Sequence, residues 1–175
     1  MRTIKVLIAI AMTGIAFERS ASAQTMFTAS IGNSFGGDAP SSKTAWAVAL
    51  AGVGAHGIGV EIEFSETRDF FETPEGLSHG KVVSLMPALF VQVPIGPVRP
   101  YGIVGFGFLR QRTSESEGGL LSNVTSDDVG FSVGGGVIVK FAAHAGVRAD
   151  LRHFKVRTSD GFSFQRFLVG FVIGG

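Results

Sequence analysis

Charged side chains that stand next to apolar residues are the part of this sequence most able to do chemistry. The segment Val60-Glu61-Ile62-Glu63-Phe64 is typical of the pattern. Charge that leaves water is costly unless it is paired, so we expect these carboxylates and cations to pair with one another inside the fold. The pairs could close the interior, which we favour, or line a narrow charge-gated pore. The residues are Glu61, Glu63, Lys140, Arg148, Asp150, Arg152 and Arg166.

Asp150, His153 and Ser159 offer the residue types of a nucleophilic site. A base beside a hydroxyl, oriented by a carboxylate, is what acyl transfer needs, and it would make the protein a lipid-modifying enzyme. The spacing matches no established pattern, and on a strand Asp150 and His153 lie on opposite faces unless a bulge intervenes. We therefore expect no enzymatic activity and no catalytic residue.

Two further patterns have simpler explanations than a cofactor or a metal. Gly52-Val-Gly-Ala-His-Gly57 matches a dinucleotide-binding string, but that string must open a helix after a strand, and here it spans a tight turn. The four histidines lie apart from one another, without the spacing of metal ligands. We predict neither a cofactor nor a metal site.

The first 23 residues have the features of a cleaved secretion signal. A basic start is followed by an uncharged run from Val6 to Phe17 and by the small residues Ala21-Ser22-Ala23. A membrane-anchoring helix is the alternative, but it needs about 20 apolar residues, and Glu18 interrupts this run. We predict a signal peptide over 1–23 and one domain over 24–175.

Composition excludes several classes of protein. Removing the signal takes three of the 15 basic and one of the 14 acidic residues, which leaves a net charge of −1 and no indication of a nucleic-acid partner. Without cysteine the chain forms no disulfide. It is 45% hydrophobic, with 25 Gly and 16 Phe, which is too apolar for an ordinary soluble globule. Apolar surface spread over many short segments is typical of a transmembrane barrel.

Alternation of apolar and polar residues predicts eight strands. In the third segment Ile58, Val60 and Ile62 share one face, while Glu61 and Glu63 share the other, as a strand requires. The fourth segment alternates least clearly, because Val82, Met86 and Phe90 fall on its expected polar face. The predicted strands are 26–33, 44–54, 57–65, 81–93, 99–110, 128–141, 146–156 and 164–173.

The connections between these strands are alternately long and short, which is typical of an up-and-down barrel. The long ones, at 34–43, 66–80, 111–127 and 157–163, are polar and would face the cell exterior. Loops on a rigid scaffold often carry binding residues, so we expect segment 111–127 to contact an extracellular partner.

The two faces of the strands decide between a membrane barrel and a soluble one. A soluble lipocalin-like carrier would point its apolar residues into a ligand cavity. An eight-stranded interior is barely wide enough for side chains, so the face with Gly, Ser and Ala suits the inside, and the bulky apolar face must point outward into lipid. We predict an all-β fold, an eight-stranded antiparallel up-and-down transmembrane β-barrel.

Aromatic residues near the strand ends are expected to form girdles at the two membrane interfaces. Phenylalanine supplies most of them, although Trp and Tyr suit an interface better. The predicted girdle residues are Trp46, Phe64, Tyr101, Phe106, Phe108, Phe131, Phe141, Phe154 and Phe164.

Three segments resemble the fifth, sixth and seventh strands of the outer-membrane β-barrel domain family, which includes OmpA-type and OmpX-type small barrels and other porin-like proteins. They are Tyr101-Gly-Ile-Val-Gly-Phe-Gly-Phe, Val129-Gly-Phe-Ser-Val-Gly-Gly-Gly-Val and Gly146-Val-Arg-Ala-Asp-Leu-Arg-His-Phe. The resemblance implies a bacterial outer-membrane location, insertion by the barrel assembly machinery and, in most members, no catalysis. The expected lipid partners are outer-membrane lipid and lipopolysaccharide. The Gly-Gly end of the chain departs from the aromatic end that is usual in the family.

Overall fold

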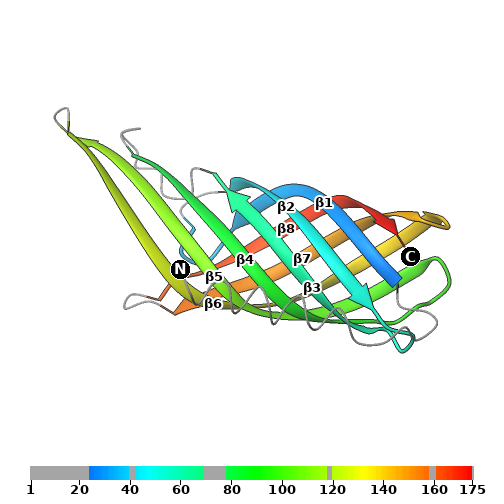
Figure 1. Ribbon diagram of the computed structural model, residues 1–175. Coiled ribbons are helices and arrows are strands. Elements are labelled where there is room, and N and C mark those ends of the chain that lie inside the picture. The colour runs from blue at the N-terminus through cyan, green and yellow to red at the C-terminus, as the bar shows by residue number, and fades with distance from the viewer. Residues whose placement is uncertain (1–23, 40–41, 69–77, 118–119, 158–160, 175) are drawn as a thin grey trace.

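The computed structural model describes residues 24–39, 42–68, 78–117, 120–157 and 161–174, with the backbone alone for 78–80 and 111–127. In this part of the chain eight strands form one closed barrel, seen from the side in Figure 1. They are β1 (Gln24–Phe35), β2 (Lys43–Val53), β3 (Ile58–Thr67), β4 (Ser78–Gln92), β5 (Val98–Glu117), β6 (Leu120–Ala142), β7 (Ala145–Arg157) and β8 (Ser163–Gly174). The predicted signal peptide, 1–23, lies outside the described residues.

Every strand pairs antiparallel with the next, and the pairing of β8 with β1 closes the sheet. This last ladder runs from Met26 opposite Gly174 to Phe35 opposite Gln165. A closed sheet has no free edge, so the backbone groups of its wall bond within the protein, as a bilayer requires. The described residues include no helix that is long and apolar enough to cross a membrane. The predicted fold class is confirmed.

The alternation in the sequence places apolar residues outside the barrel and charged or small residues inside. On β3 Ile58, Val60 and Phe64 are exposed, whereas Glu61 and Glu63 are buried. On β2 four consecutive inward positions are alanines, at 45, 47, 49 and 51, and all four are buried. These small side chains leave room for the long arginine side chains that enter from β7 and β8.

The two ends of the barrel differ. At one end, which we call the turn end, β2 meets β3, β4 meets β5 and β6 meets β7 through short connections, and β1 begins and β8 ends there. At Gly57, in the first of these turns, φ is +78°, a conformation that glycine adopts readily. We call the opposite end, with the longer connections, the loop end.

The predicted loop over 111–127 is wrong, because strand structure continues through most of it. Strand β5 runs to Glu117 and β6 starts at Leu120, with these two residues opposite each other. The segment is polar and reads as a loop, but strand pairing uses backbone groups, and outside a membrane polar side chains do not oppose it. In Figure 1 this hairpin extends well past the rest of the barrel at the loop end.

Candidate functional site

Six of the seven predicted lumen charges meet at the centre of the barrel. We call them the lumen charge cluster: Glu61, Glu63, Arg148, Asp150, Arg152 and Arg166. All six are at most 3% exposed. The carboxylates on β3 and β7 balance the guanidinium groups on β7 and β8, three against three, so the described cluster is neutral.

Arg148 and Arg152 lie on β7, each two residues from Asp150, and both contact Asp150 and Glu61. Arg148 Nη1 lies 2.5 Å from Glu61 Oε2, and its Nη2 lies 2.9 Å from Asp150 Oδ2. Arg152 Nη2 lies 2.7 Å from Glu61 Oε1 and 3.1 Å from Glu63 Oε2, and its Nε lies 2.8 Å from Asp150 Oδ1. Asp150 is therefore held between the two arginines of its own strand.

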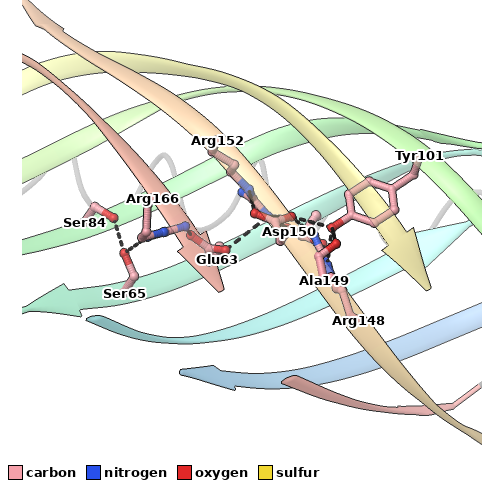
Figure 2. A network of polar contacts seen from close by, with 10 residues as sticks. Glu63, Ser65, Ser84, Tyr101, Arg148, Ala149, Asp150, Arg152 and Arg166 are labelled. Carbon is pink, nitrogen blue, oxygen red and sulfur yellow. Dashed lines mark hydrogen bonds and ion pairs between the residues drawn. The ribbon is translucent and has the colours of Figure 1, made fainter. Parts of the chain in front are cut away.

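Arg166 on β8 continues the network toward the loop end, as Figure 2 shows. It forms an ion pair with Glu63 and donates a hydrogen bond from Nη1 to Ser65 Oγ at 2.5 Å. Ser65 in turn shares a 2.7 Å hydrogen bond with Ser84 on β4. The chain of contacts thus ties β3, β4, β7 and β8 together across the interior.

Tyr101 on β5 belongs to this network, although the sequence analysis assigned it to an aromatic girdle. Its hydroxyl donates a 2.5 Å hydrogen bond to Asp150 Oδ2 and accepts one of 2.7 Å from Arg148 Nε. The Arg148 guanidinium lies 4.6 Å from the centre of the Tyr101 ring. Alternation along β5 could have identified this inward position in the sequence, because Tyr101 lies on the same face of the strand as the buried Ile103 and Leu109.

Lys140, the seventh predicted charge, does not join the cluster. It lies near the turn end, only partly buried, and its Nζ donates a 2.9 Å hydrogen bond to the carbonyl oxygen of Ala143. Alternation correctly placed Lys140 on the inward face of β6, but the prediction did not consider how far it lies from the end of the barrel. A lysine so close to a strand end reaches the mouth of the barrel rather than its centre.

Apolar layers close the interior on both sides of the charges. Toward the turn end Phe90 stacks on Tyr101 with ring centres 4.8 Å apart. Toward the loop end Phe154 stacks on Phe164, also at 4.8 Å, and Arg166 lies 4.6 Å from the Phe154 ring centre. The turn-end layer is Met26, Ala51, Val53, Ala88, Phe90, Tyr101, Ile103, Ile138 and Val172. The loop-end layer is Val82, Met86, Leu109, Phe154, Val156 and Phe164, with Ala39 and Phe162 packed against it.

Three predicted girdle residues therefore lie inside the barrel, which corrects the prediction: Tyr101, Phe154 and Phe164 are 7%, 1% and 3% exposed. The alternation on β7 continues without a bulge through His153, so Phe154 faces inward beside Arg152. The remaining members lie on the outer wall, where Trp46 packs against Phe64 at 5.6 Å between ring centres. Those remaining members are Trp46, Phe64, Phe106, Phe108, Phe131 and Phe141.

The space left at the centre is small. A cavity of about 10 Å³ lies beside Arg152 and Glu63, which is room for about one water molecule. Among the described residues, the space at this level of the barrel has room for neither a hydrated ion nor an apolar ligand. The geometry does not favour the pore or the lipocalin-like carrier.

The structure separates the residues considered for acyl chemistry. Asp150 is buried in the charge cluster, whereas His153 is exposed on the outer wall, and Ser159 lies outside the described residues. The Gly52–Gly57 string spans the β2–β3 turn and not the start of a helix. No group of three or more potential metal ligands occurs among the described residues.

Comparison with known proteins places this geometry in context. A family model described as outer membrane protein beta-barrel domain matches residues 6–173. Among curated proteins no relative matches the sequence.

Several solved structures share the fold. Neisserial surface protein A from Neisseria is similar with a TM-score of 0.64 and 13% identity, over 89% of this chain and 99% of its own. Ail, the attachment invasion locus protein of Yersinia pestis, in complex with the heparin analogue sucrose octasulfate, is similar with a TM-score of 0.61 and 14% identity, over 89% and 100%. OprG from Pseudomonas aeruginosa is similar with a TM-score of 0.58 and 12% identity, over 88% and 96%.

Proposed function

This chain belongs to the outer membrane protein beta-barrel domain family, and from that premise we propose that it is a closed membrane anchor that presents its β5–β6 hairpin at the cell surface. It is an integral protein of the bacterial outer membrane with ion pairs in its interior. Because β1 begins and β8 ends at the turn end, the loop end faces the exterior. Export by the predicted signal peptide and insertion by the barrel assembly machinery are part of this proposal.

The observation that carries the proposal is the filled interior. The lumen charge cluster occupies the middle, and an apolar layer covers it on each side. Water and ions would have to pass stacked aromatic rings at both ends and a neutral, hydrogen-bonded network between them. A barrel filled in this way can anchor the protein in the membrane without conducting ions through its interior.

The β5–β6 hairpin is the element that such an anchor would present. Strand β6 pairs with β7 only from Val129 opposite Arg157, so Leu120–Asp128 extends past the last paired residue of β7. On the other side β4 supports β5 as far as Ser78 opposite Glu115. The hairpin is thus braced on one side and stands clear of the barrel on the other. The names of two proteins of similar fold, a surface protein and an attachment protein, fit a role in contact rather than catalysis.

One pair of chains tests the proposal: the wild type, and a variant whose residues 112–125 are replaced by a two-residue Asn-Gly turn. Each is placed in planar bilayers for conductance and on the surface of otherwise non-adherent bacteria for attachment to host cells. We expect both chains to be electrically silent, and only the wild type to promote attachment. Steady single-channel currents from the wild type would contradict the closed anchor, and equal attachment by both chains would contradict the role of the hairpin.

A further inference from the structure

The loop-end part of β6 has a free backbone edge. Strand β6 pairs with β5 from Leu120 to Val139, but its pairing with β7 begins only at Val129, opposite Arg157. No described strand pairs with the other side of Leu120–Asp128, which belongs to the hairpin that projects at the loop end in Figure 1. We call Leu120–Asp128 the free edge. Unpaired backbone groups along such an edge can accept a further strand.

Alternate residues supply the hydrogen-bonding groups of the free edge. The N–H of Lys140 donates to the carbonyl oxygen of Pro97, just before β5, and the register between β5 and β6 continues unshifted to Leu120. Because successive residues of a strand direct their backbone groups to opposite neighbours, the even-numbered residues of β6 bond to β5. The odd-numbered residues therefore direct their N–H and C=O groups away from β5: Leu121, Asn123, Thr125 and Asp127.

The free edge lacks the features that usually prevent strand addition. Exposed edge strands in natural proteins are commonly very short or carry proline or lysine. The sequence of the free edge is Leu-Leu-Ser-Asn-Val-Thr-Ser-Asp-Asp, with no proline and no basic residue. Its two acids stand at the end nearer the barrel, where Asp127 lies opposite Arg110 on β5. The edge is therefore open to backbone pairing.

The free edge is complementary to itself when two copies run antiparallel. With Val124 opposite Val124 of a second copy, Asn123 pairs with Thr125 of that copy and Leu121 pairs with its Asp127. All the backbone groups that point away from β5 then have partners. Both aspartates of each copy lie opposite leucines, so like charges do not face each other directly, which would be destabilising.

The tilt of the strands decides where the second copy lies. Strands of such barrels are tilted by about 35–45°. Two copies in one membrane are related by an axis along the membrane normal, so their edge strands would run in the same direction and cross at about twice the tilt. A two-fold axis in the membrane plane, perpendicular to the hairpin, makes the strands antiparallel at any tilt. That axis places the second copy in a facing membrane.

We propose that the free edge of β6 pairs with the free edge of a second copy on a facing cell, forming an antiparallel β-zipper between the two cells. The inference rests on the proposed function, because it requires the β5–β6 hairpin to stand outside the cell, and it names a second copy as the partner of that hairpin. Since the bonds join backbone groups, the contact depends on the N–H groups of the odd-numbered residues more than on their side chains.

The test uses the folded protein in lipid nanodiscs that hold one barrel each, which excludes a partner in the same membrane. Sedimentation equilibrium should show that wild-type discs pair, and electron micrographs should show the paired discs face to face. Thr125→Pro removes one N–H of the free edge from each copy, and an edge strand tolerates proline. The pair loses two hydrogen bonds, so its Kd should rise about 30-fold. Thr125→Ala keeps the N–H and should pair like the wild type.

Wild-type discs that stay single would overturn the proposal. So would an unchanged Kd for Thr125→Pro, or an equal rise for Thr125→Ala. Migration of unboiled samples on gels checks that each barrel is folded, and if Thr125→Pro is not, Asn123→Pro and Asn123→Ala carry the same expectations. Single wild-type discs beside a silent barrel whose hairpin still promotes attachment to host cells would refute the zipper and leave the closed anchor standing.

Discussion

At the scale of single residues, the lumen charge cluster shows how six ionised groups can be buried in one small barrel. Arg152 contacts Glu61, Glu63 and Asp150, so the loss of any single partner still leaves it paired. Tyr101 supplies a hydroxyl that both donates and accepts within the same network. Buried ion pairs offset the cost of desolvation only with such dense hydrogen bonding.

Removing one partner should therefore cost far more than removing a matched pair. Arg166→Gln leaves the Glu63 carboxylate with one cation in place of two, and we expect a loss of about 3–5 kcal/mol in the free energy of unfolding. Glu63→Gln/Arg166→Gln keeps the interior neutral and should recover part of that loss. Urea unfolding in lipid vesicles, followed by Trp46 fluorescence, measures both variants and the Glu63→Gln single. Strict additivity of the two single losses would show that the residues do not interact.

At the scale of strands, alternation predicted which residues face inward even where their chemistry argued otherwise. Val82, Met86 and Phe90 weakened the expected polar face of β4, and the structure buries all three within the apolar layers. Phe154 was predicted to face outward because it is aromatic, but the alternation of β7 places its side chain inside the barrel. The period of two is a property of the extended chain and holds regardless of side-chain polarity.

Strand β6 depends on glycine where it approaches β7. A Cβ added at Gly134 would lie 2.2 Å from the carbonyl oxygen of Leu151 and 2.8 Å from Arg152 Cα, both on the neighbouring strand. Gly134→Ala should therefore lower the free energy of unfolding by about 1–3 kcal/mol. Gly102→Ala is the control, since nothing lies within 4 Å of its added Cβ. The measurement is the unfolding midpoint in urea, and an equal shift for both variants would show that close approach is not the cause.

At the scale of the whole molecule, the barrel has its polar groups inside and its apolar groups outside. Ile58, Leu89, Val104 and Phe171 are each more than half exposed, whereas every charge of the lumen cluster is buried. In water this arrangement would expose a continuous apolar surface. In a bilayer it is the stable arrangement, because acyl chains cover the wall and closure of the sheet satisfies the backbone.

A charged side chain introduced on the outer wall should reduce stability more near the middle of the bilayer than at its interface. Leu89 lies in the exposed apolar band of the outer wall, between Val60 and Val104 on the neighbouring strands, and Leu89→Arg should cost about 2–4 kcal/mol of stability in vesicles. Gln165→Arg places the same group on the outer wall near the loop end and should cost about 0–1 kcal/mol. Unfolding free energies and migration of unboiled samples on gels distinguish the two. If both variants are equally stable, the wall does not face hydrocarbon.

The sequence by itself determined the fold class, the number of strands and the approximate bounds of all but β5 and β6, because these follow from a local period of two. The same period indicated the face of each strand residue, including Tyr101, Phe154 and Phe164, which their residue type had placed on the wrong face. It also determined that Glu61, Glu63, Arg148, Asp150, Arg152 and Arg166 share the interior. Only the tertiary structure decided which of them meet, since depth depends on how eight tilted strands are shifted against one another. That shift took Lys140 to the mouth, brought Tyr101 to Asp150 and Arg148, and carried β5 and β6 past their neighbours. Which residues meet across the barrel depends on the register between distant strands, and a local sequence pattern contains no information about that register.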